Sequence, residues 1–129
     1  MAKVLIVDDS AENIEVLSSV LAQDGHVVES LRDPGQVFNT VFRVRPDLVL
    51  CDVMMPGIDG GMVTRLLRRL DETRGIPVLL CSALDESELA ARTAACGADG
   101  YVRKAALPRE ICGAVRRALR DHPRGAPAA

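Results

Sequence analysis

Short apolar runs alternate along the chain with longer segments in which apolar and polar residues are mixed. Five runs have the length and content of buried strands, at about residues 3–7, 26–31, 47–52, 78–81 and 101–103. Elsewhere apolar residues recur every three or four positions, which predicts helices at about 11–23, 34–45, 61–72, 86–96 and from 108 onward. Five strand–helix units in succession predict an α/β fold, with a parallel sheet, right-handed crossovers and helices on both faces.

Residues at the predicted helix ends support these boundaries. Ser10 is placed to cap the first helix, and Gly25 to end it. Pro34 suits the first turn of the second helix, and Pro46 closes that helix. On the third and last helices the arginines lie opposite the apolar positions, which predicts solvated basic faces made by Arg65, Arg68, Arg69, Arg116, Arg117 and Arg120.

The run that ends at Asp52 is almost entirely apolar, and Pro56 and Gly57 follow it closely. This pattern predicts a strand that is buried on both faces. Asp52 then lies at the carboxyl end of the strand, where open α/β sheets bind their ligands. A buried carboxylate is costly unless a cation or hydrogen bonds compensate its charge. The sequence therefore indicates a site around Asp52.

Composition narrows the classes of protein that remain. The length of 129 residues fits one domain, and the scarcity of aromatic residues predicts an aliphatic core. A net charge of −2 gives no general attraction to nucleic acid or to anionic membranes. No apolar run approaches the roughly 20 residues that cross a bilayer, and the N-terminus does not resemble a secretory signal. The four cysteines lack disulfide or zinc spacing, so we expect free thiols and a cytoplasmic location.

Polar residues occupy the ends of four predicted strands: Asp8 and Asp9, Asp52, Ser82, and Lys104. In a doubly wound parallel sheet all these ends lie along one edge. Neighbouring carboxylates repel one another unless a cation lies among them, and hard oxygen ligands suit Mg²⁺. A lysine can neutralise an incoming phosphate, and a hydroxyl can hydrogen-bond one of its oxygens. The arrangement predicts phosphoryl transfer with Asp52 as the nucleophile.

The chain resembles the receiver domain of two-component response regulators over about residues 3–121. The resemblance is carried by Val-Asp8-Asp9-Ser, Asp52-Val-Met-Met-Pro-Gly-Ile-Asp-Gly60, Leu-Cys-Ser82-Ala and Asp-Gly-Tyr101-Val-Arg-Lys104. It implies a flavodoxin-like fold with strand order 2-1-3-4-5. We expect a single receiver domain at 1–121, followed at 122–129 by a disordered tail or the start of a linker.

The resemblance also implies roles for the residues of the site. Asp52 would accept a phosphoryl group from a sensor histidine kinase or a phosphotransfer protein. Asp9 and Asp52 would bind Mg²⁺ through their side chains, Met54 through its backbone carbonyl, and Asp8 through a water. Lys104 would pair with the phosphate.

Ser82 and Tyr101 would act as the switch residues. Ser82 would move toward the phosphoryl oxygen, and Tyr101 would follow from an outward to an inward position. The face made by the fourth helix, the fifth strand and the last helix would then change its preference for a downstream protein. The resemblance implies a monomer or a phosphorylation-linked dimer that catalyses only its own phosphorylation and dephosphorylation. From the net charge and the short apolar runs we expect no nucleic-acid partner within this chain and no membrane partner.

The chain departs from the family pattern at Ala105, at Gly61, where a larger residue is common, and at Met54 with Leu84. Ala105 follows Lys104 where the family usually has proline, often after a cis bond. A cis bond before another residue costs about 3 kcal/mol, so we expect a trans bond here. Met54 and Leu84 occupy positions where polar residues of some relatives orient the hydrolytic water. Apolar side chains cannot do so, which predicts slow hydrolysis of the phosphoryl group.

Other interpretations stay open from the sequence alone. The departure at Ala105 is compatible with a constitutive interaction domain whose binding does not depend on phosphate. A magnesium-dependent phosphatase with an aspartyl nucleophile would need a second aspartate at the position of Met54. A dinucleotide-binding enzyme would need a glycine-rich turn after the first strand. Asp8 and Asp9 also suit a helix N-terminus, Ser82 a cap or loop, and Tyr101 the core.

Overall fold

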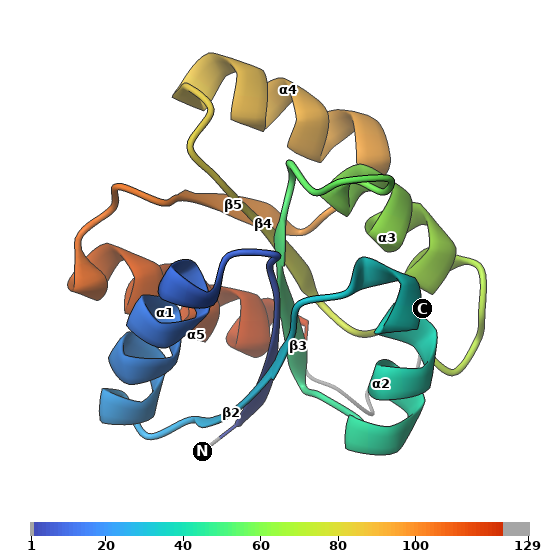
Figure 1. Ribbon diagram of the computed structural model, residues 1–129, viewed down its shortest axis with the longest axis horizontal. Helices are drawn as coiled ribbons and strands as arrows, with labels where there is room; N and C mark the ends of the chain where they lie inside the picture. The colour runs from blue at the N-terminus through green and yellow to red at the C-terminus, as the bar shows by residue number, and fades with distance from the viewer. Residues whose placement is uncertain (1, 123–129) are drawn as a thin grey trace.

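One parallel sheet lies between two layers of helices (Figure 1). The structure is a computed structural model, and it describes residues 2–122. The strands are β1 (Lys3–Val7), β2 (Val27–Leu31), β3 (Leu48–Asp52), β4 (Val78–Ser82) and β5 (Gly100–Arg103). The helices are α1 (Ala11–Gln23), α2 (Val37–Val44), α3 (Gly60–Arg68), α4 (Glu86–Cys96) and α5 (Pro108–Asp121). The strand order β2-β1-β3-β4-β5 confirms the predicted flavodoxin-like topology.

Alternate side chains of the strands divide the core into two parts. Val4 and Ile6 of β1 pack with α1 and α5 on one face of the sheet. Leu5 and Val7 pack with α2, α3 and α4 on the other face. All five residues of β3 are buried, as expected for the strand in the middle of the sheet. The sheet therefore holds the carboxyl ends of β1, β3 and β4 side by side.

The first helix has its predicted N-cap, and its C-cap lies one residue before the predicted Gly25. Ser10 caps α1 by accepting a hydrogen bond from the backbone N–H of Asn13. The C-cap of α1 is Asp24, and Gly25 follows with a φ of +90°. The second helix differs from its prediction because its first turn, Pro34–Gln36, is a 3₁₀ turn capped by Asp33.

The prediction for α3 was wrong at its carboxyl end. The helix ends at Arg68 rather than near residue 72, and Leu70, within the predicted range, is 39 % exposed. The physical reason lies in Thr73, whose buried hydroxyl donates to the carbonyl of Leu67. This bond and the turn bonds that follow end the helix.

Arg68 was expected on a solvated face and instead belongs to a half-buried ion pair. Its guanidinium donates to the carbonyl of Ile76 at 2.8 Å and to Asp99 Oδ2 at 2.6 Å. The same oxygen of Asp99 accepts the backbone N–H of Val78 at 2.7 Å. Because Arg68 is the last residue of α3, it reaches the start of β4, which the amphipathic pattern does not reveal.

Two further expectations concern the cysteines and the tail. All four cysteines are buried and free, as predicted. Of the expected tail, residues 123–129 lie outside the described part of the chain. Within residues 2–122, no helix has both the length and the apolar content needed to cross a bilayer.

Candidate functional site

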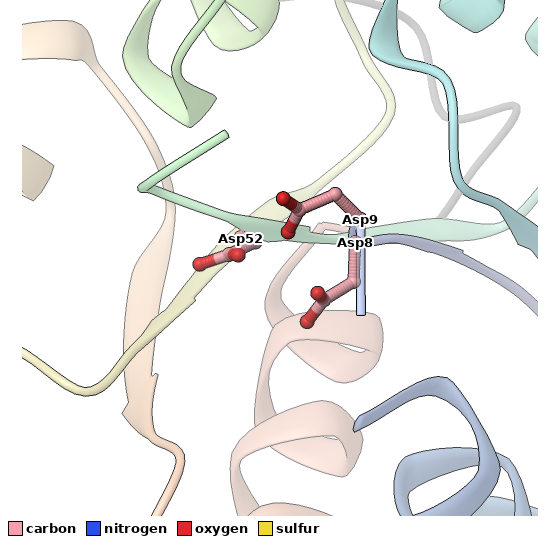
Figure 2. A group of neighbouring side chains, drawn as sticks. All are labelled: Asp8, Asp9 and Asp52. Carbon is pink, nitrogen blue, oxygen red and sulfur yellow. The ribbon is translucent and has the colours of Figure 1, made fainter. Parts of the chain in front are cut away.

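Three carboxylates gather at the carboxyl ends of β1 and β3 (Figure 2). The register that pairs Val7 with Cys51 places Asp8 beside Asp52, and Asp9 follows directly. Asp8, Asp9 and Asp52 each bring one carboxylate oxygen within 4.8 Å of the others. Asp8 and Asp52 are buried, whereas Asp9 is exposed. The predicted acidic cluster is therefore present, with one member facing solvent.

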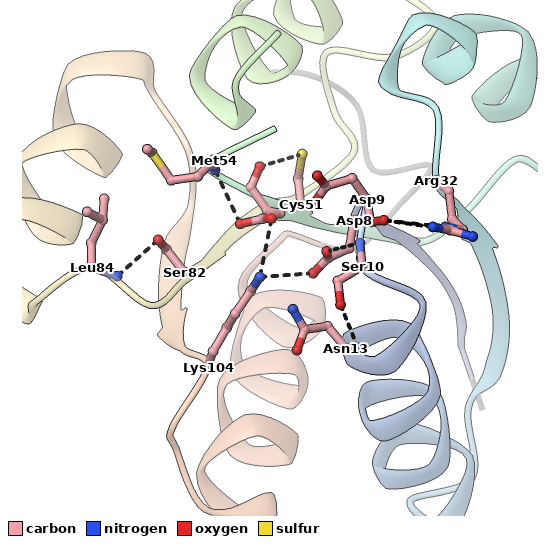
Figure 3. A network of polar contacts seen from close by, with 11 residues as sticks. Asp8, Asp9, Ser10, Asn13, Arg32, Cys51, Met54, Ser82, Leu84 and Lys104 are labelled. Carbon is pink, nitrogen blue, oxygen red and sulfur yellow. Dashed lines mark hydrogen bonds and ion pairs between the residues drawn. The ribbon is translucent and has the colours of Figure 1, made fainter. Parts of the chain in front are cut away.

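Lys104 joins two of these carboxylates (Figure 3). Its amine lies 3.3 Å from Asp8 Oδ2 and 3.2 Å from Asp52 Oδ2. The backbone N–H of Lys104 donates to the carbonyl of Ser82, which fixes the chain beside the end of β4. No cis peptide bond occurs among the described residues, so the bond from Lys104 to Ala105 is trans. Lys104 therefore contacts the carboxylates although Ala105 follows it, where the family that the sequence resembles usually has proline.

Burial and charge both shift the acid and base of the site. Burial raises the pKa of Asp52, and the neighbouring charge of Lys104 opposes this effect only in part. Burial lowers the pKa of Lys104, but the charges of Asp52 and Asp8 outweigh it and leave that pKa raised. The charge of ionised Asp52 is thus only partly offset by the neighbouring charge of Lys104. An additional cation would offset the rest.

The donor set fits a hard divalent cation such as Mg²⁺. Three carboxylates face a single ammonium group, so the site keeps excess negative charge when all are ionised. The buried Oδ2 of Asp8 has only the ion-pair contact with Lys104 and accepts no well-aligned hydrogen bond within residues 2–122. Clustered oxygen ligands with room for water suit Mg²⁺ better than softer metals.

The loop after β3 lies tightly against the phosphoacceptor candidate. The backbone N–H of Met54 donates to Asp52 Oδ1 at 3.2 Å. A Cβ atom at Gly60 would lie 2.6 Å from the carbonyl oxygen of Asp52, so only glycine fits there. The Met54 side chain is 57 % exposed. The loop therefore orients the carboxylate through its backbone and presents an apolar side chain to solvent.

Ser82 lies at the end of β4, next to the strand that carries Asp52. Its hydroxyl is buried, and Oγ accepts the backbone N–H of Leu84 at 3.1 Å. A cavity of about 320 Å³ opens at this point, lined by Asp9, Asp52, Met54, Ser82, Ala83, Leu84 and Lys104. The predicted site residues thus line this cavity, apart from Asp8, which contacts Lys104 and clusters with Asp9 and Asp52, and Tyr101.

Tyr101 lies outside this cavity. Its ring packs against the edge of the core, and its hydroxyl donates to Glu86 Oε1 at 3.1 Å. The hydrogen bond to Glu86 raises the pKa of the Tyr101 hydroxyl. Tyr101 therefore occupies an outward position, away from the carboxylates.

Sequence reasoning missed three residues around the site. Glu86 is the partner of Tyr101. Ser10 donates its backbone N–H to Asp8 Oδ1 at 2.9 Å. Arg32 donates to the backbone carbonyl of Asp9 at 3.2 Å and 3.3 Å. Arg32 directly follows β2, the neighbour of β1, so the rule that strand ends share one edge would have found it.

The curated relatives are response regulators. The DNA-binding response regulator MtrA of Mycolicibacterium paratuberculosis is 36 % identical over 118 residues, which cover 92 % of this chain and 51 % of the relative. The phosphate regulon regulatory protein PhoB of Escherichia coli is 33 % identical over 118 residues, which cover 92 % of this chain and 52 % of the relative. The chain therefore spans about half the length of the curated relatives it matches.

A solved structure and a family model point the same way. The receiver domain of a signal transduction histidine kinase from Syntrophus aciditrophicus superposes with a TM-score of 0.86 at 30 % identity, covering 100 % of this chain and 98 % of that one. The model of the response regulator receiver domain matches residues 4–116. The chain belongs to the response regulator receiver domain family.

Proposed function

We propose that Asp52 accepts a phosphoryl group from the phosphohistidine of a sensor histidine kinase or a phosphotransfer protein. As a receiver domain the chain is a signalling module of a two-component phosphorelay rather than a metabolic enzyme. The observation that carries the proposal is the contact of Lys104 with both Asp52 and Asp8, beside a third carboxylate. An acidic pocket bridged by one lysine suits a phosphoryl group held between a cation and an amine.

The transfer forms a bond between phosphorus and an Asp52 carboxylate oxygen and breaks the bond between phosphorus and the donor nitrogen. Met54 and Lys104 hold the two oxygens of Asp52 before the donor arrives, through the 3.2 Å contacts that each makes. The donor imidazole leaves with the electron pair of the broken bond. Orientation of the nucleophile is the main contribution that these contacts make.

Mg²⁺, when bound, would neutralise the oxygens of the transferring group. We assign it to the side chains of Asp9 and Asp52, the backbone carbonyl of Met54, and Asp8 through a water. Lys104 would then exchange its contact with Asp52 for one with the phosphoryl oxygen. The Ser82 hydroxyl would turn toward another phosphoryl oxygen and donate its proton to it, giving up the hydrogen bond that its Oγ accepts from the backbone N–H of Leu84.

The output of this reaction is proposed to be a change in the face made by α4, β5 and α5. A cavity of about 770 Å³ lies on this face, and Tyr101 is among its lining residues. We propose a downstream protein as the partner here, a monomer or a phosphorylation-linked dimer as the assembly, and a cytoplasmic location. Residues 1–121 are proposed as the receiver unit.

The alternative, an interaction domain independent of phosphate, rested on Ala105. The trans bond before Ala105 leaves Lys104 in contact with Asp52 and Asp8, which supports the phosphorylation-dependent function instead.

Intact-mass spectrometry tests the proposal after incubation with Mg²⁺ and a small acyl phosphate. We expect the mass of one phosphoryl group on the wild type, and none after Asp52→Asn or with a chelator. Asp71→Asn is the matched control, because Asp71 is exposed and, within residues 2–122, forms an ion pair with Arg74 alone. A folded wild type without an adduct would favour the phosphate-independent domain.

A further inference from the structure

The contact between Tyr101 and Glu86 joins two elements of the proposed output face, β5 and α4. Glu86 is the first residue of α4, and Tyr101 lies within β5. The Glu86 side chain is exposed, and the hydroxyl of Tyr101 reaches it at 3.1 Å while the ring stays against the core. The hydrogen bond therefore fixes the hydroxyl on the solvent side of the ring.

The segment that carries Glu86 begins at the site. Ser82 Oγ accepts from Leu84 at 3.1 Å, and Asp85 then caps α4 by accepting from Glu88 at 2.9 Å. The segment 82–86 thus begins with the Ser82 hydroxyl and ends with Glu86, the partner of Tyr101. When the Ser82 hydroxyl turns toward a phosphoryl group, it loses the hydrogen bond from the backbone N–H of Leu84. We expect this loss to alter the backbone path from Ser82 to Glu86.

We propose that Glu86 is a positioning residue that holds Tyr101 outward in the unphosphorylated protein and so opposes the phosphorylated conformation. The inference rests on the proposed function, because it requires Tyr101 to turn inward when Asp52 carries a phosphoryl group. A hydrogen bond that is made in only one of two conformations shifts their equilibrium by its net worth. For a solvent-exposed bond of this kind we expect a factor of roughly three.

The composition of the chain makes this contact directly observable. Tyr101 is the single tyrosine, and there is no tryptophan, so tyrosine fluorescence and phenolate absorbance both report on one residue. The hydrogen bond to Glu86 raises the pKa of Tyr101 above its ordinary value of 10.0. Loss of the contact is therefore visible before any phosphoryl group is added.

The test compares Glu86→Ala with Glu88→Ala. Each variant removes one carboxylate from the first turn of α4, but Glu88 pairs with Arg92, whereas Glu86 accepts the hydrogen bond from Tyr101. In the unphosphorylated protein, we expect Glu86→Ala alone to lower the pKa of Tyr101 toward the ordinary value. In a titration with beryllium fluoride and Mg²⁺, followed by tyrosine fluorescence, Glu86→Ala should half-saturate at a concentration about threefold lower.

A second background separates positioning from general loosening of α4. With Tyr101→Phe the hydroxyl is absent, so Glu86→Ala should no longer change the affinity for beryllium fluoride measured by calorimetry. A threefold change that persists in Tyr101→Phe overturns the proposed role, as does equal half-saturation of Glu86→Ala, Glu88→Ala and wild type. In both cases phosphorylation of Asp52 still stands. A wild type that neither responds to beryllium fluoride nor gains a phosphoryl group overturns the proposed function, and the role of Glu86 falls with it.

Discussion

The two ends of the site are held in place in different ways. At one end Lys104 makes ion pairs with Asp8 and Asp52, and all three side chains are largely buried. At the other end Tyr101 is held outward by a hydrogen bond to the exposed side chain of Glu86. Residues proposed to do chemistry are preorganised, and residues proposed to report on it are held weakly enough to move. The proposed catalytic side chains are therefore held more firmly than the side chains proposed to switch.

The largest expected effect comes from breaking the rigid end. Lys104→Ala removes the group that is proposed to neutralise the phosphoryl oxygen. We expect the rate of phosphoryl transfer from a small acyl phosphate to fall about 100-fold, a typical loss for one preorganised electrostatic contact. Rapid-quench measurements of the phosphorylated fraction provide the rate. Arg103→Ala removes a neighbouring exposed charge and serves as the control. A similar loss in both variants would mean that net charge, rather than the contact, sets the rate.

The lifetime of the phosphoryl group should respond to the side chains that rim the cavity. Met54→Asn together with Leu84→Glu introduces polar groups that can orient a water toward the phosphorus. We expect hydrolysis to become about tenfold faster, less than the roughly 100-fold effect of a well-positioned general acid or base, because these side chains are proposed only to orient the water. Release of inorganic phosphate from the phosphorylated protein measures it. Met62→Asn is the control, since Met62 is exposed outside the cavity. A wild-type lifetime no longer than that of the double variant would refute the idea.

The smallest effect concerns the stability of the rigid end itself. Because burial raises the pKa of Asp52, its ionised form destabilises the folded protein relative to the unfolded chain. Asp52→Asn should therefore increase the free energy of unfolding by about 1 kcal/mol at neutral pH without Mg²⁺. Urea unfolding in the presence of a chelator measures the difference.

The pH dependence of that difference follows from linkage. The folded protein binds the Asp52 proton more tightly than the unfolded chain does, so the wild type loses stability as the pH rises from 3.8 through the raised folded value. The increase in the free energy of unfolding that Asp52→Asn causes should be complete above this pH range and absent below it. A variant less stable than wild type at neutral pH would show that the Lys104 pair outweighs burial. Asp71→Asn, on the surface, should change little.

The rigid end could be predicted from the sequence because it depends on where strands stop. Asp8, Asp52 and Ser82 each end an apolar run or directly follow one, and parallel strands bring such ends to one edge. Lys104 follows the same rule. The family resemblance added the strand order, which the spacing of apolar residues does not contain. The fold and the carboxylate cluster could therefore be predicted from the sequence together with the family resemblance.

The contacts of long polar side chains could not be predicted in this way. Arg68 was expected in solvent because it lies opposite the apolar face of its helix, yet it reaches Asp99 across 31 positions of sequence. Glu86 was not singled out because its partner depends on the rotamer of Tyr101. Periodicity reports which face of an element is buried, and says nothing about how far a polar side chain extends. The end of α3 was misplaced for the same reason, since Thr73 bonds back to Leu67.

The close approach of Gly60 to the backbone of Asp52 has a consequence for how this sequence can evolve. Any side chain at Gly60 would collide with backbone, which cannot move aside without displacing the strand end. At the next residue, Gly61, a Cβ atom would approach the side chains of Asp59, Cys96 and Arg65 at 3.0 Å or more, and side chains can adjust more readily than backbone. Of two adjacent glycines, one is open to exchange and the other is fixed. Substitutions in this part of the loop are thus tolerated at Gly61 but not at Gly60. Relatives that keep Asp52 in this geometry should therefore keep Gly60 as well.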